Sequence, residues 1–149
     1  DWVPERFEFG FGLPPDDARD PGSVTEASIV DQRFRLRGSI DLIERNPRTG
    51  VLRVTDHKTG KNRTNRATVV QGGQILQPVL YGLAPESLTG ERVYEGRLWY
   101  CTTTGRYDEH RIELTETTRR RGIEVLEIIV RAVERGPIAA RPARDDSAD

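Results

Sequence analysis

Residues 34–57 predict two apolar strands that fold back on one another, and this hairpin constrains the fold more than any other stretch of the chain. Residues 34–44 and 51–57 are rich in aliphatic side chains, and the turn-forming sequence Asn-Pro-Arg-Thr-Gly at 46–50 separates them. Side chains of a strand alternate between two faces, so the register of the pairing decides which polar groups share a face. A slip of one residue would send a polar group through the sheet.

Two carboxylates and a lysine mark the ends of these strands. Asp41 lies on the first strand, Asp56 lies near the end of the second, and Lys58 follows two residues later. Asp56 and Lys58 point to the same face, and Asp41 joins them only if it lies opposite Asp56 or two residues from that position. Direct opposition would bring the two Cβ atoms to about 4.5–5.5 Å. Carboxylate oxygens are ligands for Mg²⁺ or Mn²⁺, and an ammonium beside such an ion can position a water.

The composition is that of a single soluble globular domain. The chain has 149 residues, of which 32% are charged and 35% hydrophobic, enough to bury a core. No apolar run approaches the ~18 residues of a membrane span, and the first residues lack the order of a signal peptide. Cys101 is the only cysteine, which excludes an internal disulfide and a self-contained thiolate metal site. We therefore expect a cytoplasmic protein with no membrane association, in which Cys101 and His110 are structural.

The overall charge gives little indication of a partner, but the basic residues are distributed unevenly. The net charge is −1 and the pI about 6.2, whereas nucleic-acid binding domains are often strongly basic. Only two of the 23 basic residues are lysines, Lys58 and Lys61. Because the chain otherwise uses arginine, a lysine at position 58 suggests a need for a compact ammonium group. The run from Lys61 through Arg63 to Arg66 either contacts phosphate or is a solvated face. The run 119–121 is expected to be a solvated face.

The rest of the chain predicts further strands and two helices. Residues 7–11 and 27–30 are expected strands, 13–23 a loop, and 92–103 with 107–114 a second hairpin. Apolar residues recur at helical spacing over 76–83, with a second stripe at Gln74, Gln77 and Tyr81 and with Pro78 near a kink or the helix start. Thr115 is a plausible N-cap for a long helix that ends at Gly136, and the apolar face of this helix holds Ile123, Leu126, Val130 and Val133. The order of elements predicts an α/β fold with a central mixed sheet flanked by helices.

Three short motifs occur in an order that resembles the pattern of a known protein family. Gly38-x-Ile40-Asp41, then Asp56-x-Lys58-Thr59-Gly60, then Gln77-x-x-x-Tyr81 resemble the nuclease domain of RecB/AddB-like exonucleases, within the PD-(D/E)XK nuclease superfamily. The resemblance implies a restriction-endonuclease-like core. It places a RecB-like nuclease domain over residues 1–142, followed by a flexible tail at 143–149.

The resemblance assigns a role to each matching position. Asp41, Asp56 and Lys58 match the catalytic residues. Asp41 and Asp56 would bind Mg²⁺ or Mn²⁺ together with the backbone carbonyl of His57. Lys58 would orient or activate the attacking water. Gln77 and Tyr81 match the helical motif associated with the site and with DNA, and Lys61 and Arg63 are further candidates for substrate binding.

Several of these residues have alternative interpretations. Asp41 and Asp56 could be a strand-end acid and a turn cap, although two converging acids without cations repel one another. Tyr81 fits core packing as well as substrate contact. The imidazole of His57 should face away from Asp56 and Lys58, toward packing or solvent. Glu44 is expected to face solvent or to pair with an arginine.

The departures from the family pattern leave two hypotheses open. The family's upstream acid or histidine has only weak substitutes here, in Glu5, Glu8 and Glu26. The cysteines that hold an iron–sulfur cluster in many AddB-like members are missing, so such a cluster would belong to a longer parent protein and the chain is expected to be a fragment. The first hypothesis is a metal-dependent DNA exonuclease of repair or recombination, with a helicase domain or subunit as partner. The alternative is a catalytically incomplete nuclease-fold module for DNA binding or for assembly of a helicase–nuclease complex.

Overall fold

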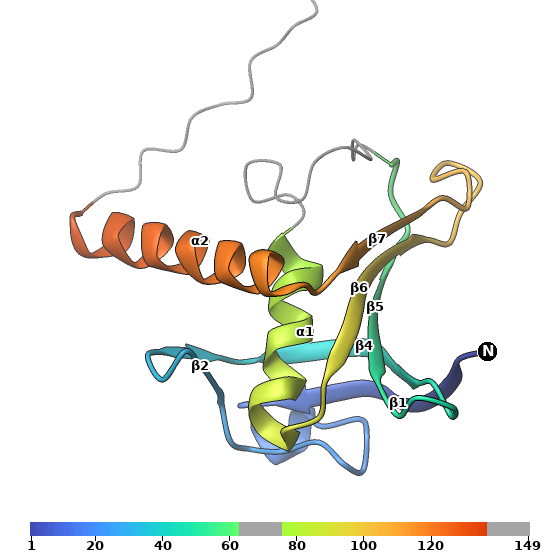
Figure 1. The fold of residues 1–149 in the computed structure, drawn as a ribbon, viewed down its shortest axis with the longest axis horizontal. Coiled ribbons are helices and arrows are strands. Elements are labelled where there is room, and N and C mark those ends of the chain that lie inside the picture. The colour runs from blue at the N-terminus through green and yellow to red at the C-terminus, as the bar shows by residue number, and fades with distance from the viewer. Residues whose placement is uncertain (63–75, 137–149) are drawn as a thin grey trace, which may run out of the picture.

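A five-stranded mixed sheet forms the centre of the protein (Figure 1). The structure is a computed structural model that describes residues 1–62 and 76–136. The strand order is β1-β4-β5-β6-β7, and every neighbouring pair is antiparallel except β5 and β6, which are parallel. The bounds of these strands are β1 Val3–Phe11, β4 Gly38–Arg45, β5 Leu52–Lys58, β6 Val93–Tyr100 and β7 Glu109–Glu113. The predicted α/β fold with a central mixed sheet is confirmed.

A separate two-stranded ribbon lies beside the helices. It consists of β2 Ser28–Val30 and β3 Phe34–Leu36, and a short 3₁₀ helix at Pro15–Asp17 lies in the loop before it. The sequence predicted one strand over residues 34–44, but the chain changes sheets at Arg37, so this stretch forms two strands, β3 and β4. The hydrophobic pattern gives no sign of the break because both strands carry apolar residues, which are partly buried in β3 and mostly buried in β4.

A buried ion pair fixes the register of the β4–β5 hairpin. Glu44 lies directly opposite Arg53, and the Arg53 guanidinium donates to both carboxylate oxygens at 2.8 and 2.7 Å. Arg97 on β6 adds a third hydrogen bond to Glu44, at 3.1 Å. The alternative in which Glu44 pairs with an arginine is therefore correct, and the solvent-facing alternative is wrong. A one-residue slip would separate these buried charges, which makes the register costly to change.

The helix α1 (Leu76–Thr89) packs against β5 and β6 at close range. Its backbone approaches β6 at Gly96, where an added Cβ would lie 2.3 Å from the carbonyl oxygen of Pro78. Pro78 lies in the first turn of the described part of the helix. The helix extends beyond the predicted residue 83 and includes a second proline, Pro85. The close contact at Gly96 places the first two turns of α1 over the ends of β5 and β6.

The helix α2 (Glu116–Glu134) crosses over α1 and extends away from the sheet (Figure 1). The side chain of Thr115 accepts a hydrogen bond from the Thr118 amide, so the predicted N-cap is confirmed. Leu126 is buried, but Val130 and Val133 are 39% and 61% exposed, so the predicted apolar face packs only along its first half. The second half extends beyond the described elements that could cover it.

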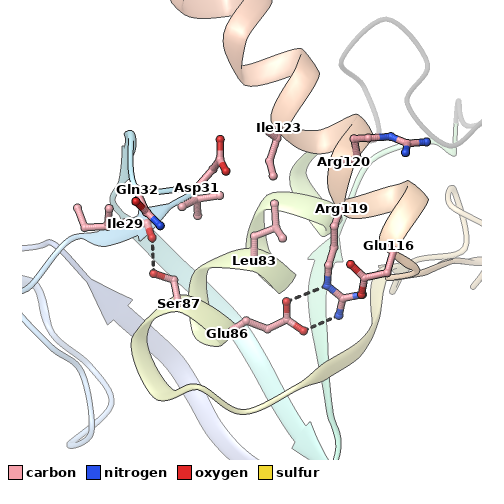
Figure 2. A pocket seen from close by; sticks show the side chains of 11 residues that line it. Ile29, Asp31, Gln32, Leu83, Glu86, Ser87, Glu116, Arg119, Arg120 and Ile123 are labelled. Carbon is pink, nitrogen blue, oxygen red and sulfur yellow. Dashed lines mark hydrogen bonds and ion pairs between the residues drawn. The ribbon is translucent and has the colours of Figure 1, made fainter.

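Arg119 links α2 to α1 and is not part of a solvated face. Figure 2 shows its guanidinium paired with Glu86 of α1, with one hydrogen bond of 3.0 Å. It also donates to the carbonyl oxygens of Leu114 and Val93, the second at 2.9 Å. Only 11% of its side chain is exposed, so the prediction for residues 119–121 is wrong at Arg119. Arg120 and Arg121 are exposed, as predicted.

No helix among the described residues is both long and apolar enough to cross a membrane. The proposed tail at 143–149 and the boundary at 142 lie outside the described residues.

Candidate active site

Asp41 and Asp56 meet where β4 and β5 separate. The β4–β5 ladder pairs Leu42 with Thr55, and extending it by one residue places Asp41 opposite Asp56, the register that a shared ion requires. Beyond this point β5 continues alone along β6 as far as Lys58. Asp41 Oδ2 accepts a hydrogen bond of 2.7 Å from the backbone amide of His57. The hairpin therefore brings together the two acids named from the sequence.

Asp56 is a buried carboxylate that pairs with Lys58. The residue is 5% exposed. Burial raises the pKa of Asp56, and the nearby Asp41 charge raises it further, while Lys58 and His57 oppose the shift. Lys58 Nζ lies 2.6 Å from Asp56 Oδ2 and forms an ion pair with it, while this buried oxygen has no other partner among the described residues. A buried carboxylate is costly in a folded protein unless a cation lies beside it, and the Lys58 ammonium takes that place here.

Lys58 is held by the first turns of α1. Its Nζ donates a hydrogen bond of 2.7 Å to Gln77 Oε1, and Gln77 Nε2 donates one of 2.8 Å to the Tyr81 hydroxyl oxygen. The helical spacing of four residues puts the Gln77 amide directly against the Tyr81 phenol. Burial raises the pKa of Tyr81, and the charges of Asp56 and Asp41 act in the same direction, so the phenol stays protonated. Gln77 and Tyr81 thus form a chain of hydrogen bonds that begins at Lys58.

Tyr81 packs in the core, as one of its two interpretations predicted, and its hydroxyl points to the polar groups around Lys58. Its ring packs against the core cluster formed by β1, β4, β5 and α1, while its hydroxyl belongs to the chain of polar contacts from Lys58. A tyrosine can do both because its ring is apolar and its hydroxyl is polar.

His57 occupies the other face of β5, as alternation along a strand requires. Its ring centroid lies 5.5 Å from that of Trp99, its partner in the parallel β5–β6 ladder. The imidazole Nδ1 is also 3.5 Å from Asp41 Oδ2. The sequence did not single out Trp99, because the pairing of β5 with β6 depends on the α1 crossover and cannot be read from either strand alone.

None of the remaining candidates that the structure describes is paired with either of the two acids. Lys61 is exposed in the segment after β5, and Arg63 lies outside the described residues, as do Gln74 and Arg66. Glu5 forms an ion pair with Arg45 at the opposite end of β4. Glu8 pairs with Arg19 at 3.6 Å and Glu26 is exposed. Across residues 1–62 and 76–136, no group of three or more acidic, histidine or cysteine side chains converges on one point.

The donor set fits a hard divalent cation with few protein ligands. Asp41 and Asp56 supply carboxylate oxygens from adjacent strands, and one oxygen of Asp56 is buried without a hydrogen bond. Mg²⁺ prefers oxygen ligands and retains several waters, so one or two carboxylates are enough to bind it. Thiolate or imidazole coordination is not required.

The family relationship follows from a match over almost the whole chain. A profile of the PD-(D/E)XK nuclease superfamily matches residues 1–146, which include the hairpin, the α1 motif and both helices. The chain belongs to the PD-(D/E)XK nuclease superfamily. Members of this superfamily typically use divalent metals and act on DNA, which agrees with the acids, the lysine and the sheet of this chain. No curated protein matches this PD-(D/E)XK chain.

Proposed function

We propose that this PD-(D/E)XK protein is a Mg²⁺- or Mn²⁺-dependent deoxyribonuclease that hydrolyses phosphodiester bonds, acting as a RecB/AddB-like exonuclease in DNA repair or recombination. The observation that carries the proposal is the meeting of Asp41, Asp56 and Lys58 at the open end of the β4–β5 hairpin, with Lys58 Nζ 2.6 Å from Asp56 Oδ2. A structural ion pair would not need a second acid beside a buried, incompletely bonded carboxylate.

Asp41, Asp56 and the backbone carbonyl of His57 would hold the divalent cation. When bound, the ion would polarise the phosphodiester, lower the pKa of a coordinated water and stabilise the leaving oxygen. The protein contributes geometry: the Glu44–Arg53 pair keeps the two strands in register, and the His57 amide orients the Asp41 carboxylate through its hydrogen bond.

Lys58 would orient the attacking water and stabilise negative charge on the phosphate. Its position is set from two sides, by Asp56 and by the Gln77 amide oxygen. Tyr81 in turn fixes the Gln77 amide, because its hydroxyl oxygen accepts the amide hydrogen of that side chain. Gln77 and Tyr81 are therefore proposed both to position Lys58 and to border the DNA.

Basic residues after β5 would guide the DNA backbone into the site. Lys61 is exposed and lies three residues beyond Lys58, and Arg63 follows it in the sequence. Phosphate contacts of this kind position a strand without reading its sequence. A helicase domain or subunit would deliver the strand, and an iron–sulfur cluster would be held outside this chain, in a longer parent protein. The helicase and the cluster would be parts of a helicase–nuclease assembly, which we propose to be cytoplasmic.

One observation supports a second candidate, a catalytically incomplete nuclease-fold module for DNA binding or for assembly. Among the described residues only two acids converge, and neither Glu5, Glu8 nor Glu26 joins them. A site with so few charged ligands would bind a cation weakly. The two candidates differ in one property, namely whether the bound DNA is cut.

The deciding experiment is degradation of labelled linear DNA by the purified chain in Mn²⁺, Mg²⁺ or EDTA. The proposal expects degradation in either metal and none in EDTA, with Asp56→Ala lowering the rate at least ~100-fold. Asp16→Ala, which changes an exposed acid of the 3₁₀ helix, is the control and should leave the rate within about 2-fold. Unchanged degradation by Asp56→Ala would sink the catalytic assignment, whereas DNA binding without cutting would favour the second candidate.

A further inference from the structure

His57 and Trp99 form an aromatic pair on the rim of the candidate site, on the face of β5 opposite Lys58. Their ring centroids are 5.5 Å apart and the ring planes are inclined by 45°. Rings at this inclination are not stacked face to face, so Trp99 leaves part of the imidazole face uncovered. The His57 side chain is 34% exposed, so part of the imidazole is accessible to a ligand.

The indole of Trp99 is held rigidly behind His57. The Arg97 guanidinium lies over the Trp99 ring, 4.9 Å from its centroid, and is itself fixed by Glu44 at 3.1 Å and by Thr55 Oγ1 at 2.9 Å. Arg97 is buried. A rigid aromatic surface loses little conformational entropy when a ligand binds to it, so the pair is preorganised for a flat partner.

The aromatic pair lies next to the acids that would bind the cation. The backbone amide of His57 donates to Asp41 Oδ2 at 2.7 Å, and the imidazole Nδ1 lies 3.5 Å from the same oxygen. The imidazole is therefore in contact with Asp41, one of the two acids that would hold the cation and its phosphate. Aromatic side chains beside a backbone-binding groove are the usual stacking surfaces for unpaired bases.

We propose that His57, supported by Trp99, is a stacking site for an unpaired nucleobase of the DNA strand held at Asp41 and Asp56. The inference rests on the proposed nuclease function and adds a base contact to it. A base inside a duplex is already stacked and paired, so it has to leave the duplex, or come from a single-stranded stretch, to reach the ring. Stacking tolerates any sequence because every base has a flat π-face.

The test measures binding of a short fluorescein-labelled oligothymidylate by fluorescence anisotropy in Ca²⁺, with the oligonucleotide checked on a gel for cleavage. A second oligonucleotide has the same backbone but abasic sugars. We expect the abasic probe to bind about 5- to 100-fold more weakly. His57→Ala should weaken binding of oligothymidylate by a similar factor and leave binding of the abasic probe unchanged.

Two further variants separate stacking from other roles of His57. His57→Phe keeps a flat ring without the imidazole nitrogens, so it should restore binding to within about 3-fold of the wild type. Tyr94→Ala removes an exposed aromatic from the other end of β6 and should change nothing. In the Trp2→Phe background Trp99 is the sole tryptophan, and oligothymidylate but not the abasic probe should quench its emission.

Equal affinity for the two probes, or a His57→Phe variant as weak as His57→Ala, would overturn the stacking site. These outcomes are independent of the proposed function, which is judged by cleavage in Mn²⁺. A chain that cuts DNA yet binds both probes equally retains the nuclease proposal and loses the stacking site. A chain that discriminates the probes but never cuts DNA retains the stacking site and loses the nuclease proposal.

Discussion

Lys58 Nζ donates a hydrogen bond of 2.7 Å to the side-chain oxygen of Gln77, so a residue on a strand end is held by a residue on the helix that covers it. The bond restricts an otherwise flexible four-carbon side chain to one position beside Asp56. Gln77 in turn contacts Tyr81. The position of the candidate catalytic ammonium therefore depends on how closely α1 approaches the sheet at Gly96.

Replacement of Gln77 by alanine tests this dependence. Gln77→Ala removes the acceptor for Lys58 without touching the acids, and we expect the rate of DNA degradation in saturating Mn²⁺ to fall about 10- to 100-fold, the usual effect of losing a group that orients a site residue. Tyr81→Phe removes only the hydroxyl at the end of the chain of contacts and should have a smaller effect. A Gln77→Ala variant of full activity would show that Lys58 does not need this bond.

The buried Asp56 predicts a metal-dependent change in stability. Asp56 has a raised pKa in the folded state, so the metal-free protein binds this proton more tightly when folded and loses stability as pH rises through the raised value. Asp56→Asn removes the buried charge and should raise the metal-free melting temperature near neutral pH.

In Mn²⁺ the wild type should have a higher melting temperature than Asp56→Asn. A cation that binds only the folded wild type stabilises it, by about 2.7 kcal/mol at 100 times its Kd. Asp56→Asn should show no such gain, and scanning calorimetry with and without Mn²⁺ measures both effects. Equal Mn²⁺ stabilisation of wild type and Asp56→Asn would place the ion elsewhere.

Glu44 predicts how the fold responds to acid. Burial by itself raises the pKa of Glu44, but the hydrogen bonds and charges of Arg53 and the charge of Arg97 outweigh it and hold the pKa below its usual value. Because the folded pKa is the lower one, this contribution to stability is present above the unfolded pKa and is lost as pH falls through the folded value.

Glu44→Gln should therefore destabilise the protein by about 3–5 kcal/mol at neutral pH, since it leaves Arg53 and Arg97 without their buried partner. It should also flatten the decline in the free energy of unfolding below pH ~4.5, near the ordinary pKa of a glutamate. Urea unfolding over a range of pH values measures both. Glu113→Gln, at an exposed position of β7, is the control, and an equal loss in both variants would contradict the role given to the buried network.

The contacts of Arg119 predict that the packing of α2 on α1 depends on the Arg119–Glu86 ion pair. Arg119→Ala removes the cationic partner of Glu86, which keeps only the Val93 amide as a donor, and two hydrogen bonds to backbone carbonyls. We expect a loss of about 2–3 kcal/mol in the free energy of unfolding. Arg120→Ala, one residue away with a side chain 68% exposed, should stay within about 0.5 kcal/mol of the wild type. Chemical denaturation compares the two, and similar losses would mean that the Arg119–Glu86 contact does not hold α2 in place.

Much of the site could be predicted from local sequence, because the hairpin is a local structure. Asp56 and Lys58 share a face through alternation alone, and the register that brings Asp41 to them is one of few that keep the aliphatic face buried. Glu44 and Arg53 carried a further signal, since opposite charges at paired positions favour one register. The helical spacing of Gln77 and Tyr81 likewise placed both side chains on one helix face.

The features that the sequence missed depend on contacts between distant segments. Trp99 lies beside His57 only because β5 and β6 are parallel, and a parallel pair needs a crossover whose path no local pattern gives. Arg119 looked like one of three solvated arginines, and only the packing of α2 on α1 distinguishes it from its neighbours. Val130 and Val133 continue the helical periodicity of buried residues but extend past the elements that could cover them.

The most direct measurement of the central claim is an anomalous difference map from a crystal of this chain soaked in Mn²⁺. The account predicts a peak between the carboxylates of Asp41 and Asp56, about 2.0–2.2 Å from an oxygen of each, and its loss in Asp56→Asn. A map with no peak at these two acids, or with the same peak in Asp56→Asn, would contradict the assignment of this site.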